Sequence, residues 1–144
     1  MDMLFRTVPF WPLIVLRLGL AAVFFAHSAQ QLGWLGGASS ARQVVRAWKD
    51  RYAIPTPIGA VGIFTEFFGS WAMLLGFLTR PFALGLMIFM FVAMWKAHWK
   101  HGFFLAHRGG EGNGIEFCLM LFLMALALVI GGGGPLSLDL KLGE

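Results

Sequence analysis

Four long apolar stretches constrain this chain more than any other feature of its sequence. A helix needs about 20 apolar residues to cross the hydrocarbon core of a bilayer. Four segments meet this requirement, and they cover residues 10–31, 57–78, 81–99 and 112–130. Only 12% of the residues are charged, against about 25% in soluble domains. The sequence therefore predicts a single all-α membrane domain over residues 1–144, and it excludes a soluble enzyme, a disordered chain and a disulfide scaffold.

The connections between these stretches predict how they are arranged. Only Thr79-Arg80-Pro81 separates the second stretch from the third, so these two should form a tight antiparallel hairpin. Glycines and a proline at 131–135 end the fourth stretch. Arg17 interrupts the first stretch, which is atypical of a signal peptide and indicates a retained helix. We therefore expect a four-helix transmembrane bundle with up-down-up-down topology, followed at 136–142 by an extended segment or a surface anchor.

The segment 39–52 has a different pattern from the four apolar stretches. Apolar residues recur at helical spacing on one face, and Arg42, Arg46 and Lys49 occupy the other. Ser39 or Ser40 can cap the start of this helix. The pattern predicts an interfacial amphipathic helix on the membrane surface; the alternative is a solvated connector. Most of the basic residues lie in the first and third loops, which the positive-inside rule places in the cytoplasm.

Glu66 is a charged residue inside the second apolar stretch. It shares a helical stripe with Gly62, Gly69 and Gly76, so it should face a neighbouring helix rather than lipid. From the membrane face where the first span ends and the second begins, Glu66 lies about 14 Å deep and Arg17 about 21 Å deep, so an arginine side chain can span the difference. Two interpretations remain open: Arg17 pairs with Glu66, or it extends to its own interface.

Polar residues from all four stretches should gather in one leaflet, because antiparallel helices bring their matching ends together. We expect either a pocket or a hydrogen-bonded network that fixes helix register. For a pocket, the expected roles divide into proton transfer by Glu66, His98 and Glu116, and ligand binding by His27, His98, Arg17, Gln31 and Trp71. The chain lacks the spacings typical of metal, haem and flavin sites, and Cys118 is its only cysteine. The methionines of the second, third and fourth stretches are expected to fill the core, and the alternative is a soft wall for a hydrophobic ligand such as a quinone.

Several short motifs, in order along the chain, resemble those of the DoxX family. They are Arg17-Leu18-Gly19, Phe25-Ala26-His27-Ser28, Glu66-Phe67-Phe68-Gly69, Leu74-Leu75-Gly76-Phe77-Leu78-Thr79-Arg80, His98 with Gly102-Phe103-Phe104, Gly114-Ile115-Glu116-Phe117 and Leu136-Ser137-Leu138-Asp139. The resemblance implies a four-helix, multi-pass protein of the prokaryotic cytoplasmic (inner) membrane. Some members of the family are linked to thiosulfate:quinone oxidoreduction or are membrane partners of redox enzymes, others are uncharacterised, and distant relatives act as assembly or trafficking factors.

Three functions are compatible with this sequence. The first is a redox subunit, an oxidoreductase component that binds quinone and takes electrons from a soluble redox enzyme or a diffusible donor. The second is a non-catalytic scaffold or assembly partner that docks a soluble enzyme onto the bilayer. The third is a small transporter. We expect membrane lipid as a partner and a chain that is either a monomer or a homodimer. We expect no nucleic acid, because the few basic residues suit anionic lipid and topology better.

Overall fold

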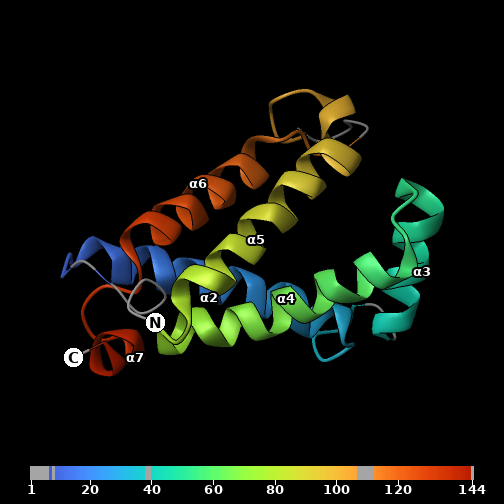
Figure 1. The fold of residues 1–144 in the computed structure, drawn as a ribbon. Coiled ribbons are helices and arrows are strands. Elements are labelled where there is room, and N and C mark those ends of the chain that lie inside the picture. Colours follow the sequence, from blue (N-terminus) through green and yellow to red (C-terminus); the bar gives the residue numbers. More distant parts are fainter. Residues whose placement is uncertain (1–6, 8, 38–39, 107–111, 144) are drawn as a thin grey trace.

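A computed structural model describes residues 7, 9–37, 40–106 and 112–143, and all the regular structure in these residues is helical (Figure 1). The elements in chain order are α2 (Pro12–Gln31), α3 (Ala41–Tyr52), α4 (Thr56–Leu75), α5 (Thr79–Ala93), a π-helical turn η1 (Met94–His98), a 3₁₀ turn η2 (Trp99–His101), α6 (Glu116–Gly131) and α7 (Leu138–Leu142).

Three helices are long and apolar enough to cross a membrane, and they confirm the first three expected spans. They are Pro12–Gln31, Thr56–Leu75 and the continuous segment Thr79–His101. The fourth apolar helix, α6, has 16 residues, which corresponds to roughly 24 Å at 1.5 Å per residue. It begins at Glu116 rather than near residue 112. That α6 makes a fourth crossing stays a prediction.

The helices pack as two pairs that meet at one end and separate at the other. α2 packs against α4, and α5 packs against α6; α4 also contacts α5, and α2 contacts α6. Figure 1 shows α5 and α6 diverging from α4 toward the end of the molecule that carries α3. The core between the pairs contains Leu20, Phe24, Met73, Leu86 and Leu128, which are almost completely buried. The bundle is therefore tightly packed at the α4–α5 turn and more open near α3.

The turn between α4 and α5 lies three residues before its expected position. Helix α5 already begins at Thr79, so the connection is made by residues 76–78 and Pro81 is the third residue of α5. Gly76 ends α4 with φ +65°, a left-handed conformation that glycine adopts without steric cost. A Cβ at Gly76 would also lie 2.2 Å from Arg17 Nη1 and 2.5 Å from Ser137 Cβ. This turn needs glycine both for its conformation and for the close approach of other segments.

The C-terminal residues 133–142, which we call the C-terminal clasp, fold against this turn. The expectation of an extended segment was wrong, because Leu138–Leu142 form α7 with Ser137 as its N-cap. Asp139 is 1% exposed. Its Oδ1 accepts from the Leu78 N–H at 2.7 Å and its Oδ2 from the Thr79 N–H at 2.8 Å. The Asp139 carboxylate thus satisfies the free N–H groups at the start of α5, which is a stabilising position for a negative charge.

Arg17 also belongs to this region. Its Nη1 donates to the Gly133 carbonyl at 2.8 Å and its Nη2 to the Leu136 carbonyl at 3.0 Å, and Asp139 attracts its charge. The expected pair of Arg17 with Glu66 was therefore wrong. The reason is helix register: Gln31, not Arg17, lies level with Glu66. Gln31 lies fourteen positions after Arg17, which is roughly 21 Å along α2.

Helix α3 begins at a serine that caps its first turn. Ser40, in an extended conformation, accepts a hydrogen bond from the Gln43 N–H; Ser39, the other expected cap, lies outside the described residues. Val45 is buried at Gly59 of α4, where an added Cβ would lie 3.1 Å from a Val45 methyl group. One face of α3 therefore packs on α4, while Arg42 and Arg46 remain exposed.

Candidate functional site

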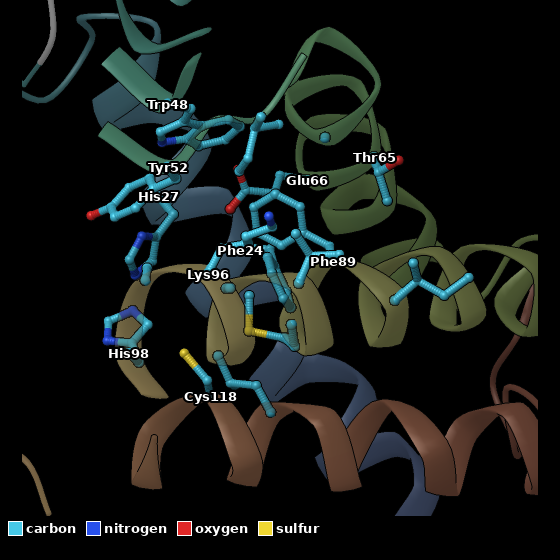
Figure 2. A pocket seen from close by; sticks show the side chains of 18 of the residues that line it. Phe24, His27, Trp48, Tyr52, Thr65, Glu66, Phe89, Lys96, His98 and Cys118 are labelled. Carbon is cyan, nitrogen blue, oxygen red and sulfur yellow. The ribbon is translucent and has the colours of Figure 1, made fainter. Parts of the chain in front are cut away.

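A cavity of about 640 Å³ lies where the two helix pairs separate. Residues from α2, α3, α4, α5, η1 and α6 line it, and Figure 2 shows them converging on one space. Its walls are largely apolar, with Phe24, Phe89, Met90 and Leu121 among them. The polar side chains that reach it are His27, Gln31, Trp48, Tyr52, Thr65, Glu66, Lys96, His98 and Asn113. An apolar space with a few polar groups is typical of a site for a small organic ligand.

Glu66 and Gln31 form the most deeply placed polar pair of this cavity. The face of α4 that carries Glu66 is buried between Gly59 and Met73, so the helix directs the carboxylate into the bundle, and Glu66 is 2% exposed. Gln31 Nε2 donates to Glu66 Oε2 at 2.6 Å. Gln31 Oε1 is buried and accepts no hydrogen bond from the described residues. An unsatisfied buried acceptor costs stability, so Gln31 offers a binding position for a donor group.

His98 is oriented by the protein backbone. It ends the π-helical turn η1, which places the consecutive residues Lys96, Ala97 and His98 along the cavity; such turns are frequent at functional sites. His98 Nδ1 lies 2.7 Å from the Asn113 carbonyl oxygen. A carbonyl only accepts, so Nδ1 carries the hydrogen. In the neutral ring, Nε2 is then the free acceptor. Figure 2 shows His98 on the same side of the cavity as His27 and Tyr52.

Glu116 does not belong to this site, which corrects the prediction from sequence. It is the first residue of α6 and is not among the residues that line the cavity. Its Oε2 accepts from the Leu105 N–H at 3.0 Å, and its own N–H donates to the Phe103 carbonyl at 2.9 Å. The expected start of the helix near 112 put Glu116 one turn inside, whereas its place at the helix end directs it to the preceding loop.

Arg17 and Trp71 also lie away from the cavity. Arg17 binds the C-terminal clasp at the opposite end of the bundle. Trp71 is 42% exposed on the outer face of α4 and packs edge-on against Phe25, with ring centroids 5.6 Å apart. The structure thus brings together His27, Gln31, Glu66 and His98 from the expected site, and separates Arg17, Trp71 and Glu116 from it.

Sequence reasoning missed the aromatic residues that α3 contributes. Trp48 and Tyr52 line the cavity, and the Trp48 ring lies 5.8 Å from that of Phe89 on α5. Both residues are on the apolar face that the sequence assigned to the membrane surface, so the periodicity identified the face but not what it covers. Lys96 was also missed. Within the described part of the chain, no three His, Cys, Asp or Glu residues gather closely enough to hold a metal ion.

Comparison with known proteins identifies the family but gives no individual relative. No curated protein and no solved structure matches the chain. The sequence model of the DoxX family matches residues 13–99, more than half of the chain. The matched segment runs from the start of α2 to the end of η1, and so contains His27, Gln31, Glu66 and His98. The resemblance seen in the sequence is therefore confirmed: this chain is a membrane protein of the DoxX family.

Proposed function

We propose that this protein is a quinone-binding subunit of a membrane redox process, linked to the oxidation of thiosulfate or another sulfur compound. The observation that carries the proposal is the cavity between the helix pairs, with the Glu66–Gln31 pair buried inside it. The proposal includes a fourth crossing by α6, placement of α3 at the membrane surface, and residence in the prokaryotic cytoplasmic membrane. It also includes a soluble redox partner and homodimer formation.

The residues of the cavity fit a quinone in size and in chemistry. A volume of about 640 Å³ falls within the range of about 300–1,000 Å³ of drug-sized ligand sites. Apolar side chains such as Phe24 and Met90 suit a flat ring, and Trp48, Tyr52 and Lys96 offer hydrogen-bond donors for its oxygens. Gln31 Oε1, which lacks a partner among the described residues, is an acceptor for the hydroxyl group of a quinol.

The side chains of the site would divide the work of binding and proton exchange. A bound quinone would supply the capacity to accept two electrons and two protons. Gln31 Oε1 and His98 Nε2 would each accept a hydrogen bond from a hydroxyl group of the reduced quinol. Gln31 Oε1 lacks a partner among the described residues, and the Asn113 carbonyl holds the other nitrogen of His98. Glu66 would exchange a proton with the bound group from its buried position. Electrons would come from the soluble partner or a diffusible donor.

Binding to the purified protein in nanodiscs tests this proposal, with a short-chain benzoquinone in its reduced quinol form as probe. We expect saturable binding to the wild-type protein and about tenfold weaker binding to His98→Ala, because the hydrogen bond from a quinol hydroxyl group to His98 Nε2, about 1.5 kcal/mol, is lost. Trp71→Ala is the matched control, because Trp71 lies on the outer face of α4, and it should bind like the wild type. The proposal fails if the wild type binds no more probe than empty nanodiscs, or if His98→Ala binds equally well.

Docking of a soluble enzyme is the second candidate function, and a charged surface favours it. Arg42, Arg46 and Lys49 are exposed on α3, the helix that packs on α4 through Val45. A protein captured specifically from mild detergent extracts by the wild type, and at least fivefold less by Arg42→Glu/Arg46→Glu, would support docking. Equal capture by both would exclude α3 as the docking surface. Capture without quinone binding would favour a scaffold over a redox subunit.

A further inference from the structure

The cavity continues as a long apolar arm between α4 and α5. On α5 the residues that line it recur about once per turn, at Gly85, Ile88, Val92 and Lys96. Lys96 lies eleven positions after Gly85, which corresponds to roughly 16 Å along the helix. Lys96 lies at the polar end near His98, and Gly85 lies at the apolar end. The arm therefore runs from the polar part of the cavity toward the middle of the bundle.

This arm opens sideways onto the outer surface of the bundle. Three apolar residues line the cavity and are also more than half exposed: Ile58 (57%) and Val61 (63%) on α4, and Ile88 (53%) on α5. Both helices are candidate membrane spans, so their exposed apolar side chains face hydrocarbon in a bilayer. The cavity thus has a side opening in a surface that contacts lipid tails.

The inner wall of the arm is formed by close aromatic packing. The Phe89 ring lies over Gly62, where an added Cβ would be only 3.1 Å from it. Phe89 also packs against Trp48 and Phe24, with ring centroids 5.8 and 6.4 Å apart. Deeper along the arm, Thr65 is its one hydroxyl side chain, and its methyl group would lie 3.0 Å from a Cβ at Gly85. This wall offers contact to hydrocarbon and almost no hydrogen bonding.

We infer that the arm is a binding subsite for a long apolar chain, so that the ligand of the cavity is a lipid quinone whose isoprenoid tail leaves between α4 and α5. This inference rests on the proposed function, because it assigns the ring to the Glu66–Gln31 end. A quinone with many isoprene units is larger than the ligands that a volume of about 640 Å³ encloses. Its tail must therefore leave the cavity, and the side opening between Val61 and Ile88 leads directly into hydrocarbon.

A tryptophan placed in the side opening tests the inference. Ile88→Trp puts a large side chain at the opening, at a position exposed enough to accept it without disturbing the core. The matched control is Leu84→Trp, one turn earlier on α5, which is 44% exposed and does not line the cavity. The probes are two quinones with the same ring, one with a single isoprene unit and one with eight. Binding is measured in nanodiscs.

For Ile88→Trp we expect at least tenfold weaker binding of the long-chain quinone and less than twofold change for the short-chain one. Leu84→Trp should bind both like the wild type. If Ile88→Trp weakens neither or both equally, the tail does not use this arm, while the proposed function stands on the wild-type binding. If the wild type binds neither quinone, the proposed function and the inference both fail.

A second measurement does not depend on a variant. The short-chain quinone is fitted with a diazirine at the end of its isoprene unit, irradiated with the wild-type protein and mapped by mass spectrometry. We expect labelling on α4 and α5 near Val61 and Ile88. Labelling confined to α3 or α6 would show that the tail leaves elsewhere and would overturn the inference.

Discussion

Replacing Asp139 with alanine is expected to lower the free energy of unfolding by about 3 kcal/mol. The carboxylate accepts hydrogen bonds from the N–H groups of Leu78 and Thr79 and attracts Arg17. Removing it leaves two donors without their acceptor and a buried guanidinium without its opposite charge. Hydrogen bonds to charged groups contribute about 1.5–3 kcal/mol each, so the loss of these two accounts for about 3 kcal/mol. Because the site is at the α4–α5 turn, the loss affects both helix pairs.

Denaturant unfolding in detergent micelles, followed by tryptophan fluorescence, measures this loss. Asp50→Ala is the control, because Asp50 is exposed on α3 and its removal changes the net charge by the same amount. We expect less than 0.5 kcal/mol from the control. Arg17→Met should also destabilise the protein, and the double variant with Asp139→Ala should cost less than the sum of the two single changes. Equal stability of Asp139→Ala and Asp50→Ala would show that the C-terminal clasp does not hold the turn.

The helices of this protein could be predicted from its sequence, but the C-terminal clasp could not. Apolar length alone identifies the spans, because backbone groups in hydrocarbon must be satisfied within the helix. The contact of Asp139 with Leu78 and Thr79 joins positions about sixty residues apart. No local pattern encodes such a contact. The alternation of apolar and polar residues at 136–142 indicated an extended segment, whereas the tertiary hydrogen bonds and the Ser137 cap produce a short helix.

Only part of the candidate site could be predicted from the sequence, because some of its contacts depend on helix register and helix boundaries. Antiparallel topology correctly brought His27, Glu66 and His98 to one end of the bundle, because it depends only on the order and length of the helices. The partner of Glu66 depends on helix register, which composition does not determine, and so Arg17 was chosen instead of Gln31. The error for Glu116 was one of helix boundary: because α6 begins four residues later than expected, the Glu116 carboxylate binds the Leu105 N–H of the preceding loop and does not itself line the cavity.

Glu66 lines the cavity and Glu116 does not, so we expect the same substitution to have different effects at the two positions. In membranes where the protein and its redox partner support quinone reduction, Glu66→Gln should lower the rate by about 10²–10⁴-fold, the usual contribution of a positioned proton-transfer group. Glutamine keeps the shape and can still accept from Gln31, so the fold and short-chain quinone binding should change little. The measurement is quinone reduction in membrane vesicles, normalised to the amount of folded protein.

Glu116→Gln is the matched control for this prediction, because the change in charge and size is identical. An amide oxygen at position 116 can still accept the Leu105 N–H, and the residue does not line the cavity, so its rate should stay within about twofold of the wild type. A large loss in Glu66→Gln alone would place proton exchange inside the cavity. Equal losses in both variants would indicate a general effect of charge on the bundle. No loss in either would leave Glu66 as a buried packing residue and favour the scaffold function, since a redox subunit needs a proton-exchanging group beside its quinone.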